Sequence, residues 1–404
     1  MRARIWWWGF WALAFALHAD PGESAPVHYI HTGFENASPL QWLTESNGTV
    51  QAHLLYDQER LSPNRAAGHW LFQVQGRKGA QVSLVLTNFD NIWNGRPGSP
   101  ISGRSHVYLS TDGKAWEILD AFKTTNNTLR VEFAMPADAV YVARLEPYRI
   151  SDLERFKTEI ATHASARVEI IGRTVEGRDL EIIRAGSLDA PYRVFIRARA
   201  HPWESGGNWV AQGMIREWLS GPGAANRQRK ICLYVMPMAN KDGVARGRTR
   251  FNSQGMDLNR KWDRPADPQL APENAALESW LESQIQQGRK PQLALDLHND
   301  NSGKLHLSRP PIPAVEDYLK RMRRFEDLMK KHTWFREGST GTNFSNPGTI
   351  GEGLLTRYGI DAAILELNCD WIEGLGKPPT AGDWERLGRD MVKVFEEFFQ
   401  DLPK

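Results

Sequence analysis

The feature that most constrains the fold of this chain is a regular alternation of short apolar segments and helical patterns that begins after Pro147. The apolar segments have the length and composition of buried strands and span residues 168–172, 180–185, 194–199, 231–236, 293–297 and 362–367. Helical patterns lie near residues 206–219, 272–286, 314–331 and 382–399. Strands that are apolar along their whole length predict a sheet covered by helices on both faces. We therefore expect an α/β domain over residues 148–404, built on a mixed, mostly parallel sheet.

A helix-start pattern marks the beginning of this domain. Ser151 and Glu154 are spaced as a capping box, in which the serine oxygen accepts one free helix N–H and the glutamate another. Leu153, Phe156 and Ile160 then recur at helical spacing. The sequence therefore predicts a first helix at this point and a domain boundary near residue 148.

Residues 20–147 have a different pattern, which is typical of antiparallel β-structure. Segments such as 70–75, 80–86 and 107–110 alternate or run apolar, and turn residues separate them. Asp112-Gly113 is a strong hairpin signal, because glycine tolerates the positive φ of a tight turn. A chain of 404 residues suits two domains. We expect an antiparallel β-sandwich in front of the α/β domain, with a structural or recruiting role and no catalytic group.

The first 19 residues have the pattern of a signal peptide. Arg2 and Arg4 form a positive start, residues 5–17 are apolar, and Ala19 offers a small residue for cleavage. The apolar run is short for a membrane span, so an uncleaved anchor is the less favoured alternative. We expect a secreted or periplasmic protein that has no membrane association after cleavage.

Charge and cysteine content exclude two classes of protein. The formal net charge of +2 includes Arg2 and Arg4, so the mature chain would be nearly neutral and lacks the basic surface that nucleic acids require. Cys232 and Cys369 are the only cysteines, which is not a disulfide scaffold. Their apolar surroundings favour buried thiols, and an oxidising compartment would also permit a bridge between them.

A candidate metal site lies at the ends of two predicted strands. His201 and Glu204 follow the strand at 194–199, and His298 ends the strand at 293–297. Each histidine alone could be structural, and a His-x-x-Glu spacing is common by chance. Together, however, two histidines and a glutamate at strand ends form the ligand pattern of a catalytic zinc ion with one open position.

The motifs around these residues resemble those of a known family. They are His-Pro-x-Glu at 201–204, Asn-x-Asp-Gly-Val at 240–244, Asp-Leu-Asn-Arg at 257–260, Asp-x-His at 296–298 and Leu-Glu-Leu-Asn at 365–368. In this order they resemble the zinc metallocarboxypeptidase superfamily of pancreatic carboxypeptidase A. The similarity is closest to the cytosolic-carboxypeptidase-like subgroup, which also carries a β-sandwich before its catalytic domain.

The resemblance implies a role for each matched residue. His201, Glu204 and His298 would bind one zinc ion, and Glu366 matches the family's catalytic glutamate. Asn259 and Arg260 match the pair that holds the carboxylate at the end of a peptide substrate. Arg250 matches the arginine that polarises the scissile carbonyl, with Arg246 and Arg248 as competing candidates, and Asp257 is a candidate for the carboxylate that orients a zinc histidine.

Two positions depart from the family pattern. Relatives of the pancreatic type have a tyrosine well before the catalytic glutamate, where this chain has Phe344; Tyr358 is too close to Glu366 to take that place. Trp203 stands where many relatives have a small residue or arginine. The pocket that selects the substrate's last side chain is expected around residues 349–352, where an inward-facing Glu352 would suit a basic substrate.

Three functions are compatible with these residues. Hydrolysis of the C-terminal peptide bond of a peptide is favoured. One alternative is hydrolysis of N-acyl amino acids, whose enzymes generally lack the sandwich. The other is a non-catalytic surface-binding protein, because Ser110–Trp116 resembles the hairpins of carbohydrate- and surface-binding sandwiches. The preferred C-terminal residue and the oligomeric state cannot be derived from the sequence.

Overall fold

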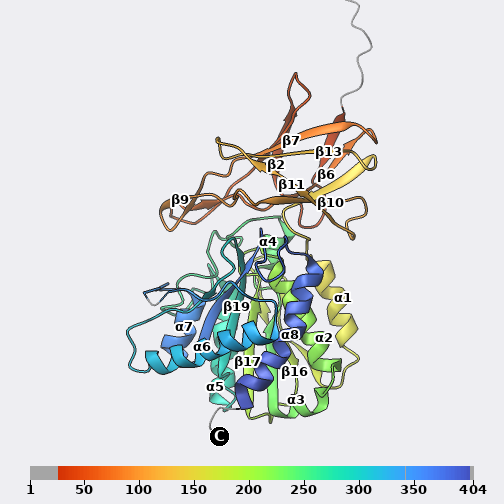
Figure 1. The fold of residues 1–404 in the computed structure, drawn as a ribbon. Helices are drawn as coiled ribbons and strands as arrows, with labels where there is room; N and C mark the ends of the chain where they lie inside the picture. The colour runs from red at the N-terminus through yellow and green to blue at the C-terminus, as the bar shows by residue number, and fades with distance from the viewer. Residues whose placement is uncertain (1–25, 342, 401–404) are drawn as a thin grey trace, which may run out of the picture.

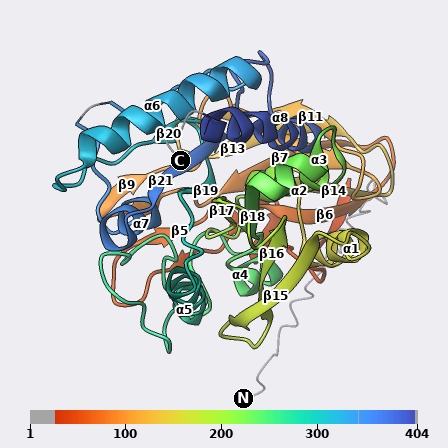
Figure 2. The same ribbon diagram turned by 90° about the horizontal axis from the view of Figure 1, so that it is seen from below.

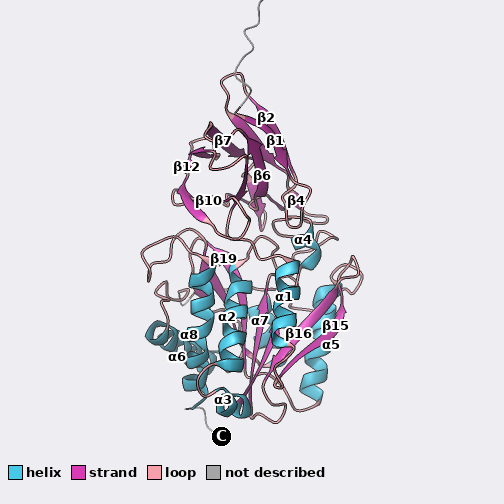
Figure 3. Ribbon diagram, turned by 90° about the vertical axis from the view of Figure 1, so that its right-hand side faces the viewer, coloured by secondary structure: helices cyan, strands magenta, loops and turns pink. Residues whose placement is uncertain are grey.

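The computed structural model describes residues 26–341 and 343–400, and the predicted signal peptide lies outside this range. An all-β region stands above an α/β region in Figure 1. Figure 3 shows the same division, with strands at one end and helices flanking strands at the other. Within the described residues, no helix has both the length and the apolar character needed to span a membrane.

Two five-stranded sheets form the all-β region. One has the order β1-β6-β14-β10-β11 and comprises β1 (Val27–His31), β6 (Leu71–Gly76), β14 (Ala139–Ala143), β10 (His106–Ser110) and β11 (Glu117–Asp120). The other has the order β12-β13-β7-β3-β2 and comprises β12 (Phe122–Lys123), β13 (Leu129–Ala134), β7 (Gln81–Thr87), β3 (Val50–Leu54) and β2 (Leu40–Thr44). Their inner faces share one buried apolar cluster, which confirms the predicted sandwich.

The sandwich contains one pair of parallel strands. β3 runs parallel to β7, while the other pairs within its two sheets are antiparallel. The intervening chain passes through other sheets before it returns, which provides the long crossover connection that a parallel pairing requires. The predicted hairpin at Asp112-Gly113 is confirmed: it joins β10 to β11, and Gly113 has a φ of 70°.

A small third sheet lies at the junction with the α/β region. It has the order β4-β5-β8-β9 and comprises β4 (Asp57–Gln58), β5 (Arg65–Ala66), β8 (Asn91–Trp93) and β9 (Arg96–Gly98). We call it the junction sheet. In Figure 1 the hairpin that ends in β9 reaches over the top of the α/β region.

The α/β region is built on a seven-stranded mixed sheet. Its order is β15-β16-β18-β17-β19-β21-β20, with β15 (Ala166–Arg173), β16 (Asp179–Ala185), β18 (Ile231–Met236), β17 (Tyr192–Ala198), β19 (Leu293–Asp300), β21 (Asp361–Asn368) and β20 (Leu305–His306). The four strands β18, β17, β19 and β21 are mutually parallel, and the outer pairings are antiparallel. The predicted α/β class is confirmed.

Helices cover both faces of this sheet (Figure 2). The predicted helices are confirmed as α2 (Gly206–Ser220), α5 (Pro272–Gln286), α6 (Val315–His332) and α8 (Ala381–Gln400). Buried residues of α2, α6 and α8 share a core with one face, and those of α5 pack on the other face. Three short helices have too weak a periodic pattern to predict: α3 (Ala224–Lys230), α4 (Lys241–Ala245) and α7 (Ile350–Tyr358).

The predicted capping box is wrong in its residues. Helix α1 (Ile150–Ile160) has Arg149 as its N-cap, two residues before the predicted Ser151. The Asp152 carboxylate accepts the Arg149 backbone N–H at 2.6 Å, and the Ser151 N–H donates to Glu35 of the sandwich. A carboxylate from another part of the chain therefore satisfies a helix N–H that local spacing assigned to a cap.

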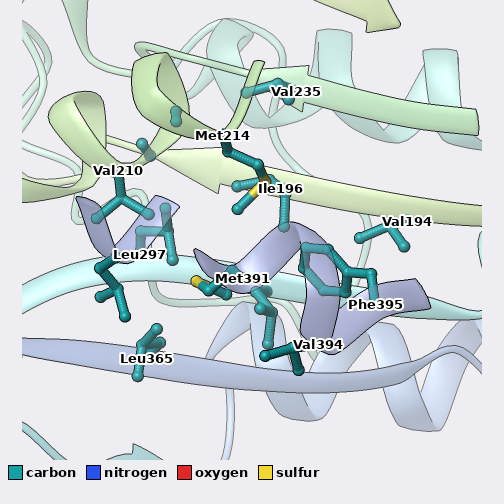
Figure 4. Packing of buried hydrophobic residues seen from close by; sticks show 14 of the residues in the cluster. Val194, Ile196, Val210, Met214, Val235, Leu297, Leu365, Met391, Val394 and Phe395 are labelled. Carbon is teal, nitrogen blue, oxygen red and sulfur yellow. The ribbon is translucent and has the colours of Figure 1, made fainter. Parts of the chain in front are cut away.

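Helices α2 and α8 approach each other closely above the sheet, as the packing in Figure 4 shows around Val210, Met214 and Met391. Gly388 allows this approach, because a Cβ added there would lie 2.0 Å from the carbonyl oxygen of Val210. The crossing therefore has no room for a side chain at this position.

Gly388→Ala should accordingly lower the free energy of unfolding by about 1–3 kcal/mol, because the two helices must move apart. Calorimetric unfolding of both proteins measures the change. Gly382→Ala, in the first turn of the same helix, is the matched control, since its nearest neighbour would be 3.9 Å away. Equal unfolding midpoints for the two variants would contradict this account of the crossing.

Candidate active site

The three predicted metal ligands converge at the carboxyl ends of two neighbouring parallel strands. His201 and Glu204 lie in the turn between β17 and α2, and His298 lies in β19. The Nδ1 atoms of the two histidines are 3.2 Å apart, and they lie 2.8 and 2.7 Å from the two carboxylate oxygens of Glu204. All three residues are buried. Two segments distant in sequence thus direct their donor atoms to one point.

A carboxylate fixes the far side of each histidine ring. His201 Nε2 lies 3.0 Å from Asp257 Oδ1, and His298 Nε2 lies 2.6 Å from Asp296 Oδ2. Arg197 in turn donates two hydrogen bonds to Asp296, at 2.7 and 2.6 Å. Each ring can therefore donate its Nε2–H and keep the Nδ1 lone pair for a metal.

Asp257 occupies the place predicted for it, whereas sequence reasoning missed Asp296 and Arg197. The available signal for Asp296 is its position two residues before His298, which puts both side chains on one face of the strand. No local pattern points to Arg197, whose partner lies on the neighbouring strand.

This donor set fits zinc. Two imidazole nitrogens and a carboxylate, with a fourth position open, are the ligands of catalytic zinc sites. Tetrahedral coordination with Zn–N bonds of about 2.05 Å would place two nitrogens about 3.3 Å apart, close to the separation of the Nδ1 atoms here. Three carboxylates (Glu204, Asp257, Asp296) face two guanidiniums (Arg197, Arg250), so the cluster with neutral histidines is anionic and favours a cation.

The pKa shifts reflect the same excess of negative charge. Burial alone would lower the pKa of His298, but the carboxylates of Asp296 and Glu204 raise it well above its usual value. Burial favours protonated Glu204, yet His201 and His298 lower its pKa to about 2. The site therefore holds Glu204 as a carboxylate, the form that binds metal.

A strained backbone supports the turn that carries His201. Arg199 is fully buried and has a left-handed backbone, with a φ of 64°. Its guanidinium donates to the carbonyl oxygen of Pro202 at 2.7 Å and to the Asn208 side chain at 2.9 Å. Arg199 therefore ties both sides of the turn together, and no sequence pattern predicted this contribution.

Glu366 lies beside the predicted metal ligands. It lies on β21 and is paired in register with His298 on the adjacent strand, β19. Burial, and then the nearby carboxylate of Asp300, raise the pKa of Glu366 well above its ordinary value. A cation at the ligand cluster would lower it again, because an opposite charge favours the ionised form. Glu366 is therefore placed to exchange a proton.

Arg250 is the one of the three candidate arginines that reaches the site. Its Nε and Nη2 donate to Asp257 Oδ2 at 2.8 and 2.7 Å. Arg246 is instead paired with Glu176, and Arg248 donates to the carbonyl oxygen of Asn252. Arg250, Asp257 and His201 thus form a continuous chain of contacts.

Asn259 and Arg260 lie on the same side of the site. Asn259 Oδ1 accepts the backbone N–H of Ile350, which fixes its amide orientation. Its Nδ2 is 3.2 Å from His298 Nε2, but that ring N–H is already donated to Asp296, so this contact joins two donors. The Asn259 N–H groups consequently remain available. Arg260 Nη1 donates to the Asn259 carbonyl oxygen, and its Nε and Nη2 reach Asn94 of the sandwich region.

A cavity of about 380 Å³ joins these side chains. Its lining from the α/β region includes His201, Glu204, Arg250, Asn259, Arg260 and Glu366. The sandwich region supplies Trp93, Asn94, Ser99 and Pro100. Four residues of the N-terminal region therefore form a wall of the cavity, and the expectation that this region supplies no catalytic group stays a prediction.

The structure shows where the residues that depart from the family pattern lie relative to the cavity. Among the described residues, no tyrosine lines the cavity; Phe344 does, with its ring centroid 4.9 Å from that of His306. The hydroxyl of Tyr358 contacts Glu282 instead. Trp203 is part of the cavity wall. Glu352 does not line the cavity and accepts a hydrogen bond from Ser308, which differs from the inward orientation considered for it.

The two cysteines are free and buried, so the structure has the thiols favoured by their apolar surroundings and no bridge between them. Cys369 lies at the edge of the cavity. Burial raises its pKa well above the ordinary value of a thiol. Neither cysteine therefore belongs to the reactive set.

The sequence of this chain is similar to those of known proteins. Residues 153–305 match the model of the zinc carboxypeptidase family. Cytosolic carboxypeptidase 2 of Danio rerio is 29% identical over 200 residues, which cover 46% of this chain and 27% of that protein. An uncharacterized protein of Zymomonas mobilis is 22% identical over 347 residues, covering 82% of this chain and 87% of that protein. The chain therefore spans most of the second relative but about a quarter of the first.

Solved structures share the whole two-part fold. A metallo-carboxypeptidase from Burkholderia cenocepacia superimposes with a TM-score of 0.80 at 20% identity, covering 92% of this chain and 98% of that one. A metallo-carboxypeptidase from Pseudomonas aeruginosa, in complex with (2-guanidinoethylmercapto)succinic acid, gives 0.75 at 21% identity and covers 92% and 100%. The family match over residues 153–305 confirms the resemblance inferred from the motifs, and the solved structures confirm the fold.

Proposed function

We propose, on the premise that residues 153–305 of this chain carry a zinc carboxypeptidase domain, that the protein is a zinc enzyme that removes the C-terminal residue of peptides. One observation carries the proposal. The Nδ1 atoms of His201 and His298 meet the carboxylate of Glu204 beside Glu366, and the same cavity contains Arg260, a cation suited to a terminal carboxylate.

Catalysis would divide among the metal and three side chains. A bound zinc ion supplies Lewis acidity and makes water nucleophilic near neutral pH. Glu366 would take the proton from the attacking water and give it to the departing amine. Arg250 would donate to the carbonyl oxygen as negative charge develops there, a contribution typically worth about 10²–10³ in rate. Asp257 holds both Arg250 and His201, so it would fix the arginine relative to the metal.

Recognition of the chain end would fall to Asn259 and Arg260. A guanidinium offers a planar pair of donors that matches a carboxylate, and the free amide N–H of Asn259 adds another. Both line the cavity that contains Glu366. A substrate held by its terminal carboxylate would therefore present its last peptide bond to the metal.

We also propose that the protein is exported. The support is the positive start, apolar run and small residue within residues 1–19. The substrates would then be peptides outside the cytoplasm. Sequencing the N-terminus of the protein recovered from cells tests this: a mature chain that still begins at Met1 would count against export by this route.

Zinc content provides the first test of the function. The purified protein should bind about one zinc ion per chain, and a chelator should remove the metal and the peptidase activity together, with both restored by zinc. His201→Ala and His298→Ala should each lower zinc occupancy sharply, because each removes one of three ligands. Elemental analysis measures the metal, and release of a C-terminal amino acid measures the activity.

The matched control is His28→Ala, which removes an exposed histidine of the sandwich region. This variant should keep its zinc and its activity. Full zinc occupancy in both ligand variants would reject the assignment of the metal site.

A further inference from the structure

A carboxylate of the junction sheet accepts hydrogen bonds from the backbone that carries Arg250. Asp57 Oδ2 accepts the N–H groups of Arg250 and Phe251, each at 2.7 Å, and Oδ1 accepts that of Thr249 at 3.3 Å. Asp57 is buried, with 9% of its surface exposed. Three consecutive backbone donors of the α/β region therefore depend on one side chain of the N-terminal region.

A second set of contacts holds the same segment from the other side. Thr249 Oγ1 accepts the backbone N–H groups of Gly68 and His69, at 2.9 and 3.2 Å. The carbonyl oxygen of Thr249 accepts the N–H of Trp203, within the turn between the ligands His201 and Glu204. The segment is thus fixed between the N-terminal region and the metal-binding turn.

The N-terminal region also packs closely against the backbone just before Thr249. Gly247, just before the segment, has a φ of 59°, and a Cβ added there would lie 2.0 Å from the carbonyl oxygen of Ala37. The side chain of Asn36 donates to the Val244 carbonyl oxygen at 2.9 Å. The backbone that leads to Arg250 is therefore packed against the N-terminal region over several residues.

The contacts that begin at Asp57 lead through Arg250 to the candidate active site. The side chain of Arg250 lines the cavity and binds Asp257, which binds His201. The guanidinium can be in place only if its own backbone is in place. A misplacement of about 1 Å in such a group can cost about 10²-fold in rate.

We propose that Asp57 is a positioning residue for hydrolysis: through the backbone of Thr249–Phe251 it sets Arg250 over the metal site, so the N-terminal region is a working part of the active site. This inference rests on the proposed function, since it assigns Arg250 the role of stabilising the developing oxyanion. It extends that function to a residue outside the carboxypeptidase domain.

Asp57→Ala and Asp57→Asn test the inference in the full-length zinc enzyme. Asp57→Ala should lower kcat about 10- to 100-fold with a smaller change in KM and unchanged zinc content, because it displaces a donor that acts in the transition state. Asp57→Asn retains one oxygen for the Arg250 and Phe251 N–H groups and should recover most of the rate. Asp120→Ala, an exposed carboxylate of β11, is the control and should behave as wild type.

A double-mutant cycle separates positioning from general structural damage. In an Arg250→Ala background, Asp57→Ala should cause less than about a twofold further loss, because the group it positions is already gone. An undiminished further loss, or normal kcat in Asp57→Ala, would overturn the proposal. If Asp57→Ala does not fold, the cycle is run with Asp57→Ser, whose shorter side chain cannot keep all three contacts, and a fully additive loss would overturn the proposal in the same way.

The position of Arg250 in a crystal structure distinguishes failure of the positioning role of Asp57 from failure of the proposed function. A crystal structure of zinc-loaded Asp57→Ala, or of Asp57→Ser if the first does not fold, should show Arg250 displaced from Asp257, whereas Asp57→Asn should keep Arg250 in place. An Arg250 that keeps its contacts in Asp57→Ala would overturn the positioning role whatever the substrate is. A wild-type protein that hydrolyses no peptide would instead reject the proposed function alone.

Discussion

Glu366→Gln should lower kcat by about 10³ or more while the zinc content stays at the wild-type level. Glutamine has the shape of glutamate but cannot take a proton from water or return it to the leaving amine. The residue is adjacent to the candidate metal ligands and is not among the three donors that converge there, so its replacement would leave that ligand set intact. Steady-state hydrolysis of a short peptide, with metal analysis of the same sample, measures both quantities.

Two other carboxylates serve as comparisons. Glu373→Gln changes an exposed side chain that pairs with Arg104 and should leave kcat unchanged. After burial itself, Asp300 is the first of the neighbouring carboxylates that raise the pKa of Glu366. Near-normal turnover by Glu366→Gln, together with a large loss in Asp300→Asn, would transfer the role of base to Asp300.

Amidation of the substrate's C-terminus should have the second largest effect. It removes the charge that Arg260 would bind and leaves the guanidinium poorly paired. We expect a cost on the order of 2–5 kcal/mol, or roughly 30- to several thousand-fold in kcat/KM. Peptides of identical sequence with a free acid or an amide at the C-terminus provide the comparison.

Arg260→Ala completes this experiment. It should impose a similar loss on the acid and little further loss on the amide, because both changes delete one interaction. Arg264→Ala is a matched control, since that exposed arginine pairs with Asp263 and does not line the cavity that contains Glu366. Equal cleavage of acid and amide by the intact enzyme would contradict a carboxypeptidase and favour an endopeptidase or amidase.

The convergence of the candidate metal ligands could be predicted because its determinants are local. His201, Glu204 and His298 each lie at the end of a short apolar strand, and parallel strands bring such ends to one edge of a sheet. The same reasoning predicted the main helices of the α/β region, whose apolar residues recur along one face. Asp257 was accessible through its motif, two residues before Asn259.

The contributions of Asp57 and Asn94 could not be predicted in this way. Each acts on an arginine more than 150 residues away in sequence, through contacts that exist only once two separately patterned regions are docked. The capping residues of α1 were predicted wrongly for the same reason: Glu35 of the sandwich region, distant in sequence, accepts the N–H of Ser151. Local periodicity and spacing carry no information about such pairings.

The shared wall of the cavity has a consequence for what can enter it. Residues of the N-terminal region and of the α/β region line it together, so a substrate would meet both regions before its last residue reached the candidate metal ligands. A helix with its side chains is about 10–12 Å wide, whereas a single extended chain takes up about 5 Å in the plane of a sheet. A protein tail would therefore enter more readily in an extended form than as part of a helix. For folded substrates the rate of trimming would follow how often the tail unravels, so that the enzyme distinguishes loose chain ends from ordered ones.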